Sequence, residues 1–171
     1  GATAGNPLVL TTVSGGSVTV QLDGAFTYTP LPAFGGNDTF TYRAKSSLGL
    51  ESAPATVTLH VSAPPTAGND SYTQAQEDQP FTAPVSVLLN DADQTDNEPL
   101  QAVLVTNVPS GAGSVTLGAD GIFTYNPAAN FNTTRPPSTP IQFTYKVTTP
   151  NGRESALATV SITVNDVNDN P

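Results

Sequence analysis

The sequence contains no cysteine, methionine or tryptophan, and it has a single histidine. Without cysteine there is no disulfide framework, no thiolate zinc site and no cysteine nucleophile, and one histidine cannot build a histidine-rich metal centre. Positive charge is also scarce: the chain has 5 Lys and Arg residues and 14 Asp and Glu residues, which gives a net charge of −9. Since phosphate backbones and anionic lipids bind clustered basic residues, the composition argues against nucleic-acid and membrane-surface partners.

Long apolar runs and helical patterns are missing as well. No segment approaches the roughly 20 apolar residues of a membrane-spanning helix, and no basic stretch followed by an apolar one indicates a signal peptide. Proline or glycine interrupts almost every window long enough for three helical turns. Instead, 25 Thr, 16 Pro and 14 Gly separate short apolar runs, which is a composition typical of strands and turns.

One unit of about a hundred residues occurs twice in the chain. Residues 16–34 match 113–131 at an offset of 97, and residues 40–57 match 143–160 at an offset of 103. Both copies alternate apolar and polar residues, as half-buried strands do. The sequence therefore predicts an all-β fold of two tandem Greek-key β-sandwich domains of Ig-like or cadherin-like type.

The first copy is shorter than the second. Residues 69–98 have no counterpart in it, because Pro7-Leu8 near its start corresponds to Pro99-Leu100. We therefore expect the first domain to lack roughly its first two strands, which lie upstream in a longer parent chain or come from a neighbour. The predicted organisation is the C-terminal portion of a first domain (1–63), a linker (64–68), a complete second domain (69–165) and the start of a linker to a following domain (166–171).

Turns and core positions repeat with the unit. Asp23-Gly24 and Asp120-Gly121 lie between alternating runs and predict β-hairpins with type I′ turns. Four Phe-Thr-Tyr triplets place two aromatic rings each on one strand face, which we interpret as core packing. Tyr72 is the least core-like aromatic and the first candidate for an exposed ring. The rings expected to be buried in the second copy are Phe123, Tyr125, Phe143 and Tyr145.

Acidic residues are the main candidates for chemistry. Seven of the 14 acids lie between positions 70 and 98 with no Lys or Arg among them. Crowded carboxylates repel unless they point into solvent or a cation neutralises them, and Ca²⁺ accepts six to eight oxygen ligands in irregular geometry. A solvated acidic surface is the open alternative. We predict that five of these acids share one Ca²⁺ site at the domain junction: Asp70, Glu77, Asp78, Asp91 and Asp93. Further candidate Ca²⁺ ligands lie in the tail: Asp166, Asn168 and Asp169.

Several of these residues form motifs that resemble a known family. The motifs are Glu77-Asp78, Asn90-Asp91-Ala92-Asp93, the hexapeptide at 120–125 (DGIFTY) and the tail Asp166-Val167-Asn168-Asp169-Asn170. Together they resemble the cadherin-like tandem repeats of large secreted bacterial adhesins, and the tail is similar to the calcium linker of cadherins. The resemblance implies extracellular or cell-surface sandwiches strung in series, often stiffened by calcium at their junctions. The internal linker lacks most of the linker carboxylates that the tail retains.

These observations favour a non-enzymatic structural and adhesion module, a rigid spacer of a large cell-surface or secreted protein. Its expected partners are neighbouring repeats of the same chain, with other cell-surface proteins or carbohydrate as further candidates. The alternative is a carbohydrate-binding accessory domain of a secreted enzyme or extracellular filament, which would use exposed aromatic rings. The sequence argues against an enzyme, because no acid, base and nucleophile converge at motif spacing.

Overall fold

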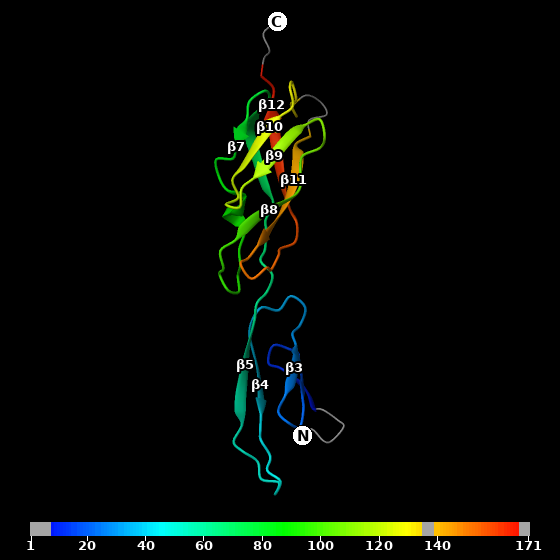
Figure 1. The fold of residues 1–171 in the computed structure, drawn as a ribbon, viewed down its shortest axis with the longest axis vertical. Helices are drawn as coiled ribbons and strands as arrows, with labels where there is room; N and C mark the ends of the chain where they lie inside the picture. The colour runs from blue at the N-terminus through cyan, green and yellow to red at the C-terminus, as the bar shows by residue number, and fades with distance from the viewer. Residues whose placement is uncertain (1–7, 135–138, 168–171) are drawn as a thin grey trace. The chain divides into compact units, whose positions relative to one another are not determined.

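The computed structural model describes residues 8–134 and 139–167. This part of the chain consists of strands, turns and one short 3₁₀-helix, η1 (Val87–Asn90), and it contains no α-helix. None of its helices is long and apolar enough to cross a membrane. The predicted all-β fold is therefore confirmed. The chain forms two compact units, Gly1–Ala63 and Pro64–Pro171, called unit 1 and unit 2 below (Figure 1).

Unit 1 has five described strands in two small sheets. One sheet has the order β1-β2-β3, and the other is the β4-β5 hairpin. All of these pairs are antiparallel. The strands are β1 (Leu8–Thr11), β2 (Ser17–Val20), β3 (Phe26–Thr29), β4 (Gly36–Tyr42) and β5 (Ala55–Val61).

Unit 2 is a β-sandwich of a three-stranded and a four-stranded sheet. The sheet orders are β7-β10-β9 and β6-β12-β11-β8, and their apolar faces share one core. The β6–β12 pair is parallel, whereas the other pairs are antiparallel. The strands are β6 (Asp70–Gln76), β7 (Phe81–Thr82), β8 (Gln101–Thr106), β9 (Gly113–Leu117), β10 (Phe123–Pro127), β11 (Ile141–Thr148) and β12 (Ala158–Asn165).

Aromatic rings fill the centre of unit 2. Phe123, Tyr125, Phe143 and Tyr145 are fully buried, so the predicted core is confirmed. Tyr72 belongs to the same cluster, with its ring centroid 4.9 Å from that of Phe123. Tyr72, the first candidate for an exposed ring, is therefore a core residue. Its polar neighbours in the sequence lie on the outer face of β6, while Tyr72 itself points inward, as the two-residue period of a strand requires.

The two Asp-Gly turns differ from the predicted type. Gly24 and Gly121 have positive φ angles of 88° and 79°, but Asp23 and Asp120 do not. A type I′ turn requires positive φ at both central residues, so the type I′ assignment is wrong. Each aspartate instead accepts a hydrogen bond from the backbone N–H two residues later, at 3.0 Å in unit 1 and 3.1 Å in unit 2. Only the glycine then needs the left-handed conformation.

Candidate functional site

Two acidic side chains meet at the end of unit 2 where β6 and β12 both finish. The parallel pairing sets Gln76 opposite Asn165, so the next residues, Glu77 and Asp166, emerge side by side. The Glu77 side chain is buried, with 1% of the residue exposed. Its Oε1 accepts a hydrogen bond from the Val167 N–H at 2.7 Å. This carboxylate therefore holds the chain segment that leaves β12.

An amide group bridges the two carboxylates. Asn132 Nδ2 donates to Glu77 Oε2 at 2.9 Å and to Asp166 Oδ1 at 3.0 Å. The loop that carries Asn132 is held on one side by Asp78, whose Oδ1 accepts from the Asn130 N–H at 2.8 Å. Asn132 was not predicted from the sequence. The available signal is its position beside the six-residue insertion that distinguishes the second copy.

The same loop is attached to β12 by a threonine. The Thr133 N–H donates to the Val164 carbonyl at 2.9 Å, and the Val164 N–H donates to Thr133 Oγ1 at 2.8 Å. Thr133 is only 5% exposed. These two bonds continue the ladder of β12 beyond its pairing with β11, which ends at Ile141 opposite Ile162. The insertion thus begins as an ordered clamp that positions Asn132 over the carboxylates.

A second acidic cluster surrounds the hydroxyl of Tyr145. Asp70 Oδ2 lies 3.0 Å and Asp91 Oδ2 3.1 Å from this oxygen, and the carbonyls of Gly68 and Val87 each lie 3.0 Å away. One hydroxyl proton can serve only one acceptor at a time. The two carboxylates therefore compete for a single donor.

Burial changes the proton affinity of this cluster. Desolvation raises the pKa of Asp70 to about 6, the hydrogen bond from Tyr145 opposes this, and the charge of Asp91 adds to it. The pKa of Asp91 is also raised, mainly by burial, although hydrogen bonds from Gly68 and Tyr145 act against the rise. Burial and both carboxylates raise the pKa of the Tyr145 hydroxyl. The pair therefore holds a proton in mildly acidic solution more readily than free carboxylates do.

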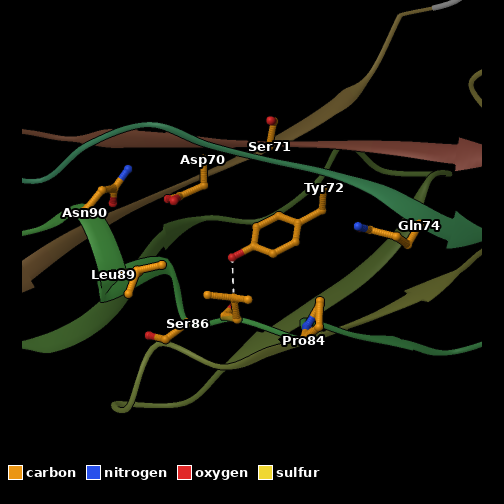
Figure 2. Close-up of a pocket in the computed structure, with 9 residues that line it drawn as sticks. Asp70, Ser71, Tyr72, Gln74, Pro84, Ser86, Leu89 and Asn90 are labelled. Atoms are coloured by element: carbon orange, nitrogen blue, oxygen red, sulfur yellow. Dashed lines mark hydrogen bonds between the residues drawn. The ribbon is translucent and has the colours of Figure 1, made fainter.

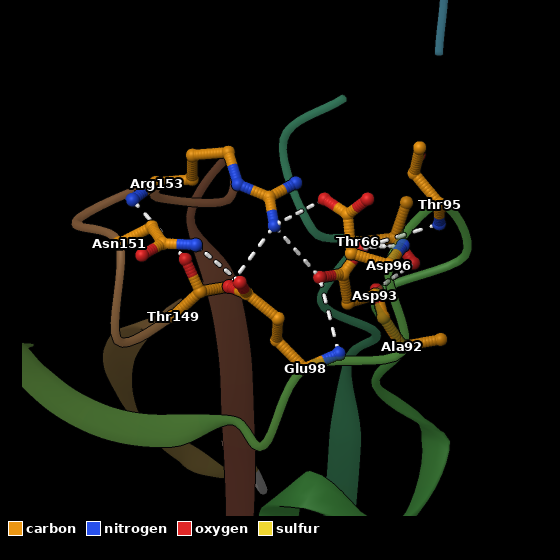
Figure 3. A network of polar contacts seen from close by, with 9 residues as sticks. All are labelled: Thr66, Ala92, Asp93, Thr95, Asp96, Glu98, Thr149, Asn151 and Arg153. Carbon is orange, nitrogen blue, oxygen red and sulfur yellow. Dashed lines mark hydrogen bonds and ion pairs between the residues drawn. The ribbon is translucent and has the colours of Figure 1, made fainter. Parts of the chain in front are cut away.

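A third cluster gathers acids around one arginine (Figure 3). Arg153 Nη2 lies 3.0 Å from Asp93 Oδ2, 2.7 Å from Asp96 Oδ2 and 3.0 Å from Glu98 Oε2. Asn151 also donates a hydrogen bond to Glu98. The Arg153 side chain is only 16% exposed, so solvent screens these contacts little. A single guanidinium thus serves as the internal counter-ion of this loop.

Asp93 also organises the loop backbone. It accepts hydrogen bonds from the N–H groups of Thr95, Asp96 and Glu98 at 3.2 to 3.3 Å. Burial acts to raise the pKa of Asp93, but these backbone donors and the charge of Arg153 outweigh it and lower the pKa. Arg153 lies 60 residues from Asp93 in the sequence, and no short motif links the two. This explains why the pairing was not predicted.

Within unit 2, the five acids predicted to share one site do not lie together. A seven-residue strand spans roughly 20 Å, and β6 separates Asp70 from Glu77 by this length. Within residues 8–134 and 139–167, no group of three or more His, Cys, Asp or Glu side chains is placed to hold a metal ion. Asn168 and Asp169 lie outside the described residues. The others fall into the three clusters: Asp70 and Asp91 at Tyr145, Asp93 at Arg153, and Glu77, Asp78 and Asp166 around the Asn132 loop.

A pocket of about 260 Å³ lies along β6 (Figure 2). Its lining mixes polar and apolar side chains of β6 with those of the segment before and within η1. The Tyr72 ring reaches across from β6, and its hydroxyl donates to the Val85 carbonyl at 2.8 Å. Because Tyr72 is only 7% exposed, it offers no flat ring for sugar stacking. The lining residues are Asp70, Ser71, Tyr72, Gln74, Pro84, Val85, Ser86, Leu89 and Asn90.

Family comparison agrees with the two units. Residues 62–166 match the family model of the bacterial cadherin-like domain, which is more than half of the chain. The chain belongs to this family. Unit 2 is its cadherin-like domain, and residues 2–60 of unit 1 match the family model of the bacterial Ig domain. The predicted resemblance to cadherin-like and Ig-like repeats is confirmed, and domains of both kinds are typically extracellular and non-catalytic.

Whole-protein comparisons add little to the assignment of this cadherin-like chain. No curated protein matches it. Among solved structures, an endo-fucoidan hydrolase from glycoside hydrolase family 107, MfFcnA4, is similar at 16% identity with a TM-score of 0.43. The match covers 95% of this chain but 24% of the hydrolase, so the chain spans about a quarter of that protein. A likeness of this size carries no argument about activity.

Proposed function

We propose that the chain is a non-enzymatic spacer module of an extracellular or cell-surface protein, and that its partners are neighbouring repeats. Two units with a shared strand framework follow one another in the chain, and both match families of bacterial repeat domains. The polar clusters of unit 2 join segments between and after its strands that lie 52 to 90 residues apart in the sequence. Such joints resist bending, which is what a spacer needs.

We further propose that Ca²⁺ binds at the end of unit 2 where Glu77 and Asp166 meet, and that it stiffens the exit of the chain there. The observation that supports this is the bridge that Asn132 makes between the two carboxylates. Both carboxylates offer oxygen ligands, and rotation of the Asn132 amide by half a turn would replace its Nδ2 with Oδ1. Ca²⁺ takes six to eight oxygens, so backbone carbonyls, water and the predicted ligands Asn168 and Asp169 would complete the shell.

A cation at this position would have a clear mechanical effect. Glu77 already holds the Val167 N–H, and Asn132 connects both acids to the clamped loop. Bound Ca²⁺ would replace the single bridging amide with several charge-assisted contacts between the segment after β12 and the sandwich. The exit of the chain from unit 2 would then bend less freely.

Thermal unfolding of the intact chain in calcium and in chelator tests the proposal. We expect unit 2 to gain about 2.7 kcal/mol when free Ca²⁺ is a hundredfold above its dissociation constant. Glu77→Gln should abolish most of this gain, because it removes one charge and one oxygen ligand. Asp120→Asn is the matched control, since it removes a carboxylate from a turn outside the site, and it should keep the full gain.

A second arm separates this site from the cluster at Tyr145. Asp70→Asn should leave the calcium gain intact. If Asp70→Asn abolishes the stability gained in calcium and Glu77→Gln leaves it unchanged, calcium binds at the Tyr145 cluster instead. Equal melting temperatures of the wild-type chain in calcium and chelator would leave the acids as structural groups without a metal.

The carbohydrate-binding alternative has less support. Among the described residues, the exposed aromatic rings are Phe26 and Tyr42, both in unit 1. Their counterparts in unit 2, Phe123 and Tyr145, are fully buried core residues. The two rings of unit 1 are therefore exposed because fewer strands cover them than cover their counterparts in unit 2. Their exposure does not require a sugar-stacking platform.

A further inference from the structure

Four strands of unit 1 repeat four strands of unit 2 in identical register. In the β2–β3 pair Val18 lies opposite Tyr28, and the corresponding Val115 of β9 lies opposite Tyr125 of β10. The β4–β5 hairpin shows the same agreement with β11–β12. There, Phe40 opposite Val57 matches Phe143 opposite Val160. Unit 1 thus contains the framework of a sandwich, and unit 2 shows how that framework is completed.

Three strand edges that are covered in unit 2 are open in the described part of unit 1. β8 covers β11 in unit 2, and the other two edges are covered by strands of the segment that has no counterpart in unit 1. β6 covers β12 in parallel, with Tyr72 opposite Ile162, and β7 covers β10, with Phe81 opposite Tyr125. The counterparts of β12 and β10 are β5 and β3. Within the described part of unit 1, each of these is the outermost strand of its sheet. Such edges present backbone N–H and C=O groups to a further strand.

The exposed rings of unit 1 lie where the covering strands would pack. Phe26 is 42% exposed, whereas its counterpart Phe123 is fully buried. Both rings keep one equivalent neighbour, at 5.3 Å from Phe40 in unit 1 and 5.1 Å from Phe143 in unit 2. The additional neighbours of Phe123 are rings of β6 and β7. They are Tyr72 at 4.9 Å and Phe81 at 6.0 Å.

A second ring gives the same result independently. Tyr42 is 47% exposed, and its counterpart Tyr145 is fully buried. The Tyr145 hydroxyl is enclosed by Gly68, Asp70 and groups of the segment around η1. All of these groups lie in the linker or in the segment that has no counterpart in unit 1. Leu104 of β8 also lies opposite Tyr145, so this segment encloses the hydroxyl end of the ring. Phe26 and the hydroxyl end of Tyr42 therefore mark the surface that this segment covers in unit 2.

We propose that unit 1 is a strand acceptor, and that its ligand is an extended polypeptide segment of the same type as residues 69–83. The first strand of this ligand pairs in parallel with β5, and the second pairs with β3. The ligand carries two aromatic residues nine positions apart, as Tyr72 and Phe81 are, and these rings cover Phe26. Recognition thus combines backbone pairing along the edge with ring packing at two positions.

A chimera of the full chain tests this proposal. Residues 69–98 replace residues 1–6, so that the copied Glu98 precedes Pro7 as it precedes Pro99 in unit 2. The matched control carries Tyr72→Asp and Phe81→Asp in the copied segment only. In chelator, amide hydrogen exchange in β5 should be on the order of tenfold slower, or more, in the chimera than in the control. Exchange in β12 should be equal in both.

A second measurement covers the case in which the chimera does not fold. A synthetic peptide of residues 69–86 is added to the intact chain, with the same peptide carrying Tyr72→Asp and Phe81→Asp as the control. Selective protection of β5 by the first peptide supports the proposal. Equal exchange with both peptides overturns it. The proposal is also overturned if β5 is already protected in the unmodified chain, the protection disappears on dilution and the chain sediments as a dimer. In that case a second copy of the chain occupies the edge of β5.

Discussion

Units 1 and 2 share a strand framework but differ in what fills it. Among the described residues, unit 1 buries two apolar side chains, Val18 and Phe40, whereas the core of unit 2 contains 18. The registers of the four shared strands are identical. Pairing therefore follows from the local pattern of each hairpin, whereas burial depends on the strands that close the sandwich. Hairpins alone do not make a core.

The units also differ in the polarity of one interior position. Asp38 in unit 1 is 1% exposed and accepts hydrogen bonds from the Ser14 N–H, the Thr39 N–H and the Tyr28 hydroxyl at 2.8 to 2.9 Å. The Thr12 hydroxyl donates to it as well. The corresponding residue of unit 2 is Ile141, which packs in the apolar core. At this position unit 1 thus has a buried carboxylate that accepts several hydrogen bonds, whereas unit 2 has an apolar side chain packed in the core.

The sharpest test of the comparison replaces the paired phenylalanines. Phe123→Ala should destabilise unit 2 by about 3–5 kcal/mol, the range for removing a core aromatic. Phe26→Ala should cost unit 1 roughly 1 kcal/mol, because much of the ring is already in water. Chemical denaturation with probes in each unit measures both values. Equal losses would show that Phe26 is covered in solution and would break the comparison.

A second test uses the paired glycines of the Asp-Gly turns. A Cβ on Gly24 meets no atom within 4 Å, so Gly24→Ala should cost only the left-handed strain of about 1–2 kcal/mol. A Cβ on Gly121 would lie 2.2 Å from Ser86 Oγ, which accepts the Leu88 N–H at the start of η1. Gly121→Ala should therefore cost about 1 kcal/mol more, the value of a lost helix cap.

The same denaturation experiment measures the loss of unfolding free energy in the two glycine variants. Ser86→Ala in the wild-type background is the control for the cap alone. If Gly121→Ala and Gly24→Ala cost the same, Ser86 moves aside freely, and the segment around η1 packs less tightly on the turn than its contacts indicate.

A smaller effect is expected from pH, and its sign differs between the units. Burial raises the pKa of Asp70 to about 6 from 3.8, so folded unit 2 binds more protons than the unfolded chain in this range. Its stability should fall as pH rises from about 4 to 6, by about 1–2 kcal/mol after allowance for solvent screening. Asp70→Asn should flatten this slope, and Asp120→Asn should keep it.

Unit 1 should respond in the opposite direction. Burial acts to raise the pKa of Asp38, but the four hydrogen bonds from Thr12, Ser14, Tyr28 and Thr39 outweigh it and hold the pKa well below the usual 3.8 of an aspartate. Its contribution to stability is present above about pH 4 and is lost on further acidification. Melting curves between pH 3 and 7 measure both units. A unit 1 that gains stability on acidification below pH 4 would contradict the assigned role of Asp38.

Part of the site was predictable, and part was not. The motif Glu77-Asp78 and the tail acid Asp166 were recognised as candidate ligands, because clusters of carboxylates are visible in the sequence. Their partner Asn132 was missed, since an asparagine in a loop has no pattern of its own. Asp91 and Asp93 are two residues apart in the sequence, yet Asp91 contacts Tyr145 while Asp93 contacts Arg153. Proximity in sequence therefore did not indicate a shared site.

The sequence by itself determined the repeat, the all-β class and the aromatic core of unit 2, because alternation with a period of two is a local property of a strand. Only the tertiary structure decided which acids meet. The parallel pairing of β6 with β12 joins Glu77 to Asp166, although 89 positions separate them in the chain. The length of the same strand keeps Glu77 away from Asp70. Strand direction and length thus divided the acids among the ends of unit 2, and neither is visible in local composition.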